Sequence, residues 1–323
     1  MRIEPEEIKN ILAVRNDRFG EFLLNIPALR ALKETFGNAR LELVVDPYVK
    51  ELAECVPFID GVIEWGRGSH SLLEKLQLIS LLRRQNIDIA VMLNPSREFN
   101  IITALAGIPL RAGYDRKWGF LLTHKIKDSK YRAEKHEIEY NLELAGLCRA
   151  KTADKSLVLN ISGQLPLCGI EDTDRFIAIH PWTSDPLKQW PQENFRELAK
   201  KLTQELSVRI VIVGAHPLSG QDSSLFDNLG GNIINMLGRT TLKELALFLK
   251  KSALLVSGDS GPVHLACAVD TPVLAIFASG LPGKSSRRWG PLQKNSAVIE
   301  RDNLSEISAE EVFTKVMEVL NKR

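Results

Sequence analysis

The sequence predicts an α/β protein made of two doubly wound domains, and three observations lead to this fold class. In both halves of the chain, short apolar stretches that suit buried strands alternate with longer stretches that suit helices. A chain of 323 residues is long for a single hydrophobic core. The alternation lapses around residues 150–174 and then restarts, as expected of a linker. We therefore expect an N-terminal domain at residues 1–164 and a C-terminal domain at residues 165–323, with the last helix free to pack back on the first domain.

Helices of ordinary length between the strands indicate βαβ units, in which the strands run parallel. The predicted strands of the first half are residues 11–15, 40–45, 61–65 and 88–93, and its predicted helices are residues 21–37, 71–85, 98–106 and 136–147. The predicted strands of the second half are residues 156–161, 176–180, 208–214, 232–236, 254–256 and 273–277, and its helices are residues 192–206, 241–250 and a last one. That last helix begins with the capping box Ser308–Glu311 and carries Val312, Val316 and Leu320 inward.

Composition and charge narrow the class of protein. The chain is 44% hydrophobic and 25% charged with a net charge of +2, which is typical of a globular protein and does not imply a nucleic-acid partner. No apolar run approaches the roughly 18 residues of a membrane span, and the charged N-terminus lacks the apolar core of a signal peptide. The four cysteines (55, 148, 168 and 267) lie far apart, so neither a zinc site nor a disulfide framework is expected. These features predict a cytoplasmic protein.

The stretch VSGDSGPVHLACAVDTPVLAIF, residues 256–277, reads as strand, glycine-broken loop, helix and strand. Gly258 and Gly261 allow a tight turn, and Pro262 suits a first helical turn, where its missing N–H costs nothing. The free N–H groups at such a helix start form an anion site, to which the side chains of Ser260 and His264 could add donors. A phosphate or diphosphate is the first candidate ligand.

A second polar loop follows the predicted strand 176–180, at the same edge of the same sheet. In HPWTSDPLKQWPQENF, Thr183 and Ser184 offer hydroxyl groups and Lys188 offers a cation. A lone lysine in a loop is usually a solvated surface charge, but this one lies beside the phosphate-like loop. Because ligands of doubly wound folds bind outside the carboxyl ends of the strands, we expect Lys188 to face the same anion.

The loop after the first strand, NDRFGEFLLNIPALRALK, offers a carboxylate. Gly20 lets the backbone approach a ligand, and Glu21 stands at a helix start. Glu21 either complements the helix dipole or acts as a general base, and Asp17 in the same loop is a competing carboxylate. A GxGxxG fingerprint is absent here, which argues against a nicotinamide dehydrogenase.

Together these stretches resemble glycosyltransferase family 9, the bacterial ADP-heptose:lipopolysaccharide heptosyltransferases. The motifs of the family appear in order as RNDRFGEFLLNIPALRALK, KQWPQENFRELAKKL and DSGPVHLACA, and LNPSREFNIITALAGIPLRAGY is similar to its acceptor-side stretch. The resemblance runs along nearly the whole chain. It implies the GT-B fold, with an N-terminal Rossmann-like domain for the acceptor and a C-terminal one for the nucleotide-sugar facing each other across a cleft.

The resemblance also implies an inverting transfer that needs no metal and no cofactor, with heptose moving from ADP-heptose to a lipopolysaccharide-core or related saccharide. The expected catalytic residues are Glu21 and Lys188, the expected donor-binding residues are Thr183, Ser184, Lys188, Asp259, Ser260, Gly261, Pro262 and His264, and the expected acceptor-binding residues are Arg18, Gly20, Ser96 and Arg97. In this scheme the diphosphate lies against Lys188, the two hydroxyls and the N–H groups of Ser260, Gly261 and Val263.

Two departures from the family pattern leave alternatives open. Glu21 replaces the catalytic aspartate of the family, and Asp222 is the only acid near the end of strand 208–214, where the family holds the donor ribose. The alternatives are a transferase that uses a different nucleotide-sugar, a non-catalytic nucleotide-sugar or saccharide binder, and a nucleotide-sugar epimerase. The epimerases lack the pairing of the second and third motifs.

Residues 111–135 contain eight Lys or Arg against three Asp or Glu. This stretch is either a solvated basic face or a surface that attracts an anionic glycolipid acceptor. The second reading implies peripheral contact with the inner face of the cytoplasmic membrane.

Overall fold

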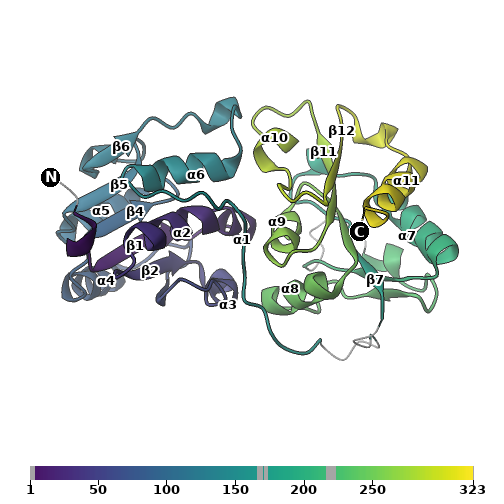
Figure 1. Cartoon of the computed structure of the whole chain (residues 1–323), viewed down its shortest axis with the longest axis horizontal. Coiled ribbons are helices and arrows are strands. Elements are labelled where there is room, and N and C mark those ends of the chain that lie inside the picture. The colour runs from purple at the N-terminus through teal and green to yellow at the C-terminus, as the bar shows by residue number, and fades with distance from the viewer. Residues whose placement is uncertain (1–3, 166–169, 171–173, 216–222, 323) are drawn as a thin grey trace. The chain divides into compact units, whose positions relative to one another are not determined.

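The structure is a computed structural model that describes residues 4–165, 170, 174–215 and 223–322 (Figure 1). The chain divides into two compact units, Met1–Leu157 and Val158–Arg323, a few residues before the border expected from the sequence. Cys168 and Asp222 lie outside the described residues. Within the described part of the chain, no helix is both long enough and apolar enough to cross a membrane.

The first unit is a six-stranded parallel sheet in the order β3-β2-β1-β4-β5-β6 with helices on its faces (Figure 1). Its strands are β1 Asn10–Arg15, β2 Arg40–Val45, β3 Gly61–Glu64, β4 Ile89–Met92, β5 Leu110–Tyr114 and β6 His124–Ile126. Its helices are α1 Phe19–Leu23, α2 Ile26–Thr35, α3 Lys50–Ala53, α4 Leu72–Arg84, α5 Arg97–Leu105 and α6 Glu137–Gly146. Apolar side chains of α4 and α5 pack on β1 and β4 and form one of the cores of this unit.

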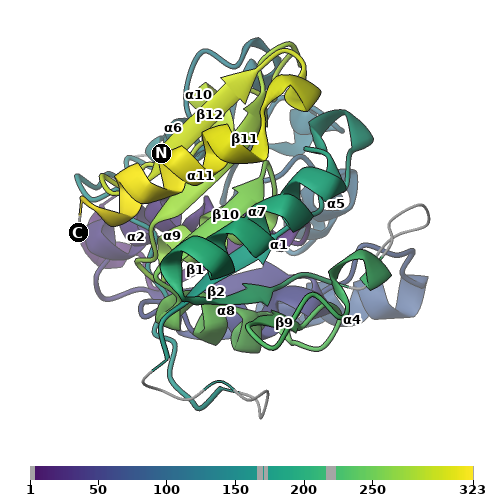
Figure 2. The ribbon, with the colours of Figure 1, turned by 90° about the vertical axis from the view of Figure 1, so that its right-hand side faces the viewer.

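The second unit repeats the architecture with the strand order β12-β11-β10-β7-β8-β9, again all parallel. Its strands are β7 Phe176–His180, β8 Arg209–Ile212, β9 Ile233–Asn235, β10 Leu254–Gly258, β11 Val273–Ala278 and β12 Ala297–Arg301. Its helices are α7 Gln192–Leu206, α8 Leu242–Lys251, α9 Gly261–Ala268, α10 Ser286–Trp289 and α11 Ala309–Leu320. α7 and α11 lie side by side over one face of this sheet (Figure 2).

The last helix is held inside the second unit. Val312 and Val316 are fully buried in its core, as expected, and Leu320 is partly buried against the same cluster. Ser308 accepts the N–H of Glu311 at 3.1 Å, while the Glu311 carboxylate binds Arg301 at 2.9 Å. The apolar face of α11 is thus covered by its own unit.

Two expectations about single elements were wrong, and three strands were missed. The predicted helix 21–37 is two helices, because the chain turns at Asn25 and Pro27 occupies the first turn of α2. The stretch 156–161 is not a strand; Leu159 and Ile161 are buried, but the Leu159 N–H donates to the carbonyl of Ala268 rather than to a strand. The strands β5, β6 and β12 were not predicted.

The strand order places the candidate residues. In each sheet the order reverses between two strands, β1 and β4 in the first and β7 and β10 in the second. Ligands of doubly wound sheets bind at such a reversal, outside the carboxyl ends of the strands. The expected catalytic, donor-binding and acceptor-binding residues lie in the four loops that follow these strands or in the first turns of the helices after them, whereas Asp222 lies outside the described residues.

Candidate functional site

A buried arginine organises the carboxylates of the first unit. Arg15 ends β1 and is only 3% exposed. Its guanidinium donates to Asp17 Oδ1 at 2.6 Å, to Glu21 Oε2 at 2.5 Å and to the carbonyl of Leu93, beyond β4, at 2.9 Å. One cation therefore fixes both carboxylates that the sequence proposed as bases, at the reversal point of the sheet.

The shared arginine does not make the two carboxylates equivalent. Burial is the largest effect on Asp17 and, with the charge of Glu21, raises its pKa to about 6 although Arg15 opposes this. Burial also acts to raise the pKa of Glu21, but Arg15, a hydrogen bond with Asp17 and the charges of Arg18 and Lys130 lower it below its ordinary value. At neutral pH Glu21 is thus the firmly ionised member of the pair.

The remaining residues of this loop support α1. Arg18 is the N-cap residue, Gly20 is buried in the first turn, and the carbonyl of Glu21 accepts the side-chain N–H of Asn25 at 2.6 Å. Glu21 keeps about a third of its side chain exposed. Its carboxylate is oriented by Arg15 while the side chain stays partly accessible, as a base that meets a substrate requires.

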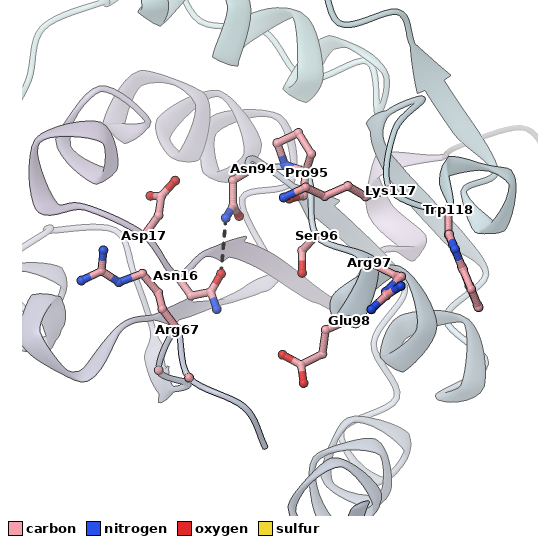
Figure 3. Close-up of a pocket in the computed structure, with 12 residues that line it drawn as sticks. Asn16, Asp17, Arg67, Asn94, Pro95, Ser96, Arg97, Glu98, Lys117 and Trp118 are labelled. Atoms are coloured by element: carbon pink, nitrogen blue, oxygen red, sulfur yellow. Dashed lines mark hydrogen bonds between the residues drawn. The ribbon is translucent and has the colours of Figure 1, made fainter. Parts of the chain in front are cut away.

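A pocket of about 650 Å³ opens beside this loop (Figure 3). Among the described residues its lining includes Asp17, Ser96 and Arg97, but not Arg18, Gly20 or Glu21. Two of the four expected acceptor residues therefore face the pocket and two support the neighbouring helix. The full lining is Asn16, Asp17, Gly66, Arg67, Gly68, Asn94, Pro95, Ser96, Arg97, Glu98, Lys117 and Trp118.

Amide groups form the polar floor of this pocket. The side-chain amide of Asn94 donates to Asn16 Oδ1 at 3.4 Å (Figure 3). That of Asn16 donates to the carbonyl of Trp65 at 3.3 Å. The side-chain oxygen of the same asparagine, Asn94 Oδ1, is buried and has no hydrogen-bond partner among the described residues. Because a buried acceptor is costly without a donor, Asn94 suits a ligand that carries hydroxyl groups.

The carboxylate of Glu98, which also lines the pocket, is paired with positively charged or hydrogen-bonding neighbours. Glu98 accepts the indole N–H of Trp65 at 3.0 Å and lies 3.2 Å from Lys75 and 3.4 Å from His70. Burial acts to raise the pKa of Glu98, but these partners lower it overall. Within the part of the chain that the structure describes, the nearby Arg97 and Lys117 form no ion pair, so this wall of the pocket is positive.

In the second unit, the structure brings together two residues that the sequence assigned to separate tasks. Lys188, at the end of the loop after β7, forms an ion pair with Asp259, which follows β10. The side chains are 17% and 8% exposed. Burial raises the pKa of the Asp259 carboxyl even though Lys188 opposes the shift. Lys188 is thus held at the reversal point of the sheet by a buried counter-charge.

The two loops also pack closely through Thr183. Its N–H donates to Gln189 Oε1 at 3.0 Å and its hydroxyl donates to the carbonyl of Asp185 at 2.8 Å. A side chain at Gly258 would lie 2.9 Å from the Thr183 methyl, so glycine is needed there for this close approach. Thr183 therefore shapes the loop, while the neighbouring Ser184 is exposed.

The start of α9 keeps fewer free N–H groups than the sequence suggested. The N–H of Val263 donates to the carbonyl of Ser260 at 3.2 Å, and Pro262 has none. Among the described residues, the N–H groups of Ser260 and Gly261 donate to no acceptor and so remain for an anion. The Ser260 side chain is at the N-cap position but makes no cap hydrogen bond. His264 is buried one turn in, with its ring 6.4 Å from that of Trp289.

A buried histidine explains why the Ser260 side chain turns away from α9. His180 Nδ1 lies 3.1 Å from Ser260 Oγ and 3.2 Å from Ser257 Oγ, and the two hydroxyl oxygens are 2.8 Å apart. The Ser257 hydroxyl donates to the carbonyl of Gly258 at 2.9 Å. All four contacts are satisfied only if Ser260 donates to Ser257 and His180 Nδ1–H donates to both oxygens. Burial lowers the pKa of His180 to about 4, so the ring is neutral.

This proton assignment predicts a small effect of Ser260→Ala. Since the hydroxyl proton points inward to Ser257, it is not available to a phosphate, and we expect donor affinity to fall by less than about tenfold. Isothermal titration with the nucleotide-sugar measures the change. A loss of about a hundredfold would mean that Ser260 donates to the ligand and that the assignment is wrong.

Several functional residues were missed by sequence reasoning. Arg15, Asn94 and His180 each stand at or just after the end of a strand beside the reversal point, which is the signal that could have found them. Lys284, in the segment after β11, lies 2.5 Å from Asp185 of the loop after β7, and its side chain is partly exposed. Asp222, which the sequence singled out for the ribose, lies outside the described residues.

Comparison with known proteins gives one consistent family. The model of glycosyltransferase family 9 (heptosyltransferase) matches residues 75–317. Lipopolysaccharide heptosyltransferase 2 of Salmonella typhimurium is 24% identical over 310 residues, which cover 84% of this chain and 83% of the relative. The structure of a family 9 glycosyl transferase from Veillonella parvula matches with a TM-score of 0.85 at 21% identity, covering 99% of both chains.

The structure of the ADP-heptose lipopolysaccharide heptosyltransferase II of E. coli matches with a TM-score of 0.80 at 21% identity, covering 97% of this chain and 99% of that one. These likenesses confirm the GT-B fold expected from the sequence. The family model spans well over half of the chain and includes both loops that hold Lys188 and Asp259. The protein is therefore a glycosyltransferase that belongs to family 9, the heptosyltransferases.

Proposed function

We propose that the enzyme transfers heptose from ADP-heptose to the saccharide of a lipopolysaccharide core, with inversion at the anomeric carbon. The heptosyltransferases among its relatives and structural neighbours support this donor and acceptor. The observation that carries the proposal furthest is the pair of carboxylates on the buried Arg15, beside a pocket whose floor and wall suit a hydroxylated, anionic ligand.

In the proposed reaction, an acceptor hydroxyl held by the first unit gives its proton to the carboxylate of Glu21. The hydroxyl oxygen forms a bond to the anomeric carbon of the donor from the face opposite the diphosphate. The bond between that carbon and the diphosphate oxygen breaks, and its electron pair leaves with ADP. A single displacement of this kind inverts the anomeric centre. A cleft between the two domains, as expected from the sequence, stays a prediction.

The donor loops of the second unit are assigned to the leaving diphosphate. Lys188 supplies a positive charge that Asp259 holds in place, and the N–H groups of Ser260 and Gly261 supply donors that are fixed before the reaction. In this proposal His264 and Ser184 also contact the diphosphate. We further propose that the reaction takes place in the cytoplasm, on an acceptor at the inner face of the membrane.

The nucleotide and the sugar are tested together by native mass spectrometry of the purified protein with a panel of nucleotide-sugars, followed by a transfer assay. We expect retention of ADP-heptose in preference to UDP- and GDP-sugars, and transfer of heptose to a heptose-deficient core saccharide. Preference for another nucleotide-sugar would identify a different donor. Tight binding without transfer to any acceptor would point to a non-catalytic binder.

Transfer is expected to be independent of divalent metal ions. Lys188 and the start of α9 are proposed to supply the positive potential that a metal would otherwise provide at the diphosphate. Activity should therefore survive excess EDTA, measured as release of ADP. Loss of activity that magnesium restores would contradict this assignment.

A further inference from the structure

The first turns of α4 present apolar side chains to solvent. Leu72, Leu73 and Leu76 are 73%, 65% and 52% exposed. Further along the same helix the exposed positions are polar, namely Gln77, Ser80, Arg83 and Arg84. Surface helices normally place polar residues on their outer face. The exposed leucines are therefore confined to one end of α4.

A second exposed apolar group lies in the loop after β5. Trp118 is 49% and Phe120 is 70% exposed, and their ring centroids are 5.8 Å apart. Trp118 has a left-handed backbone conformation, with φ of 70°, just before a short helical turn at Gly119–Leu121. Such a conformation is uncommon for a bulky residue and indicates a loop held in a defined shape.

Both groups are connected to the pocket of the first unit through residues that line it. Trp118 lines it, and the guanidinium of Arg97 lies 5.8 Å from the Trp118 ring (Figure 3). Glu98, which also lines this pocket, is bound by Lys75 in the first turn of α4. The five side chains Leu72, Leu73, Leu76, Trp118 and Phe120, hereafter the apolar collar, thus belong to two elements that each contribute to the pocket or contact its lining.

Positive charge accompanies the apolar collar. Arg97 and Lys117 line the pocket together with Trp118 and form no ion pair among the described residues, and Lys75 of α4 is the partner of Glu98. Exposed aromatic and leucine side chains next to Lys and Arg suit the interface of an anionic bilayer. A protein partner would need a complementary acidic surface, whereas a membrane supplies the acyl region and the phosphates together.

We propose that the apolar collar docks on an anionic lipid bilayer, so that the pocket opens at the level of the lipid headgroups. Docking of this kind would present a lipid-linked saccharide directly to Asn94 and to the carboxylates on Arg15. The benefit for catalysis rests on the proposed function, but binding to lipid does not. The two can therefore fail separately.

The test is sedimentation of the whole chain with two kinds of vesicle. The neutral vesicles contain phosphatidylcholine, and the anionic vesicles contain phosphatidylcholine and phosphatidylglycerol in equal amounts. We expect binding to the anionic vesicles to exceed binding to the neutral ones. The variant Leu73→Ser/Phe120→Ser should weaken the partition into anionic vesicles by about tenfold or more, because each side chain loses apolar area that would be buried in the interface.

A matched control is Leu105→Ser/Leu292→Ser, which removes two exposed leucines that do not belong to the apolar collar and are 53% and 56% exposed. This control should bind vesicles like the wild type. Neither the Leu73 nor the Phe120 side chain lines the pocket, so transfer to a lipid-free acceptor should be unchanged in the first variant.

The proposal is overturned if the wild type does not bind anionic vesicles, or if the Leu73→Ser/Phe120→Ser variant binds them like the control. It is also overturned if the wild type is a dimer and this variant a monomer by light scattering, because the apolar collar then contacts a second copy of the chain. Vesicle binding together with absence of heptosyl transfer would leave the membrane surface intact and contradict the proposed function alone.

Discussion

Replacement of Glu21 by glutamine is expected to lower the turnover number by about 10²-fold or more while donor affinity holds. Glutamine keeps the shape of the side chain and can still accept the hydrogen bond from Arg15, but it cannot take a proton from the acceptor hydroxyl. The fold should survive, because Asp17, no longer opposed by a neighbouring charge, remains as the ionised partner of Arg15. The measurement is steady-state kinetics, with the melting temperature as a check on folding.

Asp17→Asn is the matched control, because Asp17 shares the same arginine and lines the pocket. If Glu21 is the base, this variant should lose less than about tenfold in turnover, because the ionised carboxylate remains. If Asp17→Asn abolishes transfer while Glu21→Gln does not, the base is Asp17. Full activity in both variants would mean that this loop does not supply the base.

The pH dependence of kcat separates the two carboxylates independently. A general base must be ionised, so activity falls as the pH drops through its pKa. Glu21 has a lowered pKa, so with Glu21 as the base the acid limb should lie below the ordinary range of a glutamate. Asp17 has a pKa raised to about 6, so with Asp17 as the base activity should already fall below about pH 6.

Glu21→Asp restores the residue usual in the family, but the arm is one methylene shorter. In this structure the longer arm is what reaches the Arg15 guanidinium at 2.5 Å. We expect measurable activity below the wild-type level. Activity equal to that of Glu21→Gln would show that the loop has adjusted to glutamate and no longer accepts the shorter side chain.

The sequence predicted correctly the strands and helices that a pattern within their own residues defines. The bounds of β2, β7 and α7 are those expected, because a continuous apolar run or an amphipathic period marks each of them. The apolar stretch 156–161 carries the same signal but forms no strand, because its backbone meets the end of α9 at Ala268. β5 has a half-buried charge and a glycine, and its pairing with β4 and β6 defines it as a strand.

The site, too, could be predicted only as far as local patterns allow. The alternation of strands and helices predicts the loops at the carboxyl ends of the strands, and so Glu21, Lys188 and Asp259 could be singled out. Which side chains touch depends on the tertiary structure. The sequence does not indicate that Lys188 contacts Asp259, because that ion pair joins two separate loops. Nor does it indicate that Arg15 binds two carboxylates, because those contacts depend on the conformation of the loop after β1.

Lys188→Ala is expected to lower kcat/KM by about 10²-fold, with weaker donor binding and slower turnover together. The substitution removes the cation proposed to face the diphosphate. It also leaves the Asp259 carboxylate buried without its counter-charge, and that carboxylate would repel an anionic donor. Kinetics with varied donor and titration with ADP measure the two effects.

The matched control is Lys284→Ala, which removes a lysine of the segment after β11 from its ion pair with Asp185 in the loop after β7. Lys284 is more exposed than Lys188, so loss of its ion pair should change kcat/KM by no more than a few-fold. If repulsion by Asp259 accounts for part of the Lys188→Ala defect, Lys188→Ala/Asp259→Asn should bind ADP more tightly than Lys188→Ala. Wild-type affinity and turnover in Lys188→Ala would show that Lys188 only neutralises the charge of Asp259. The diphosphate would then have to be bound by other residues.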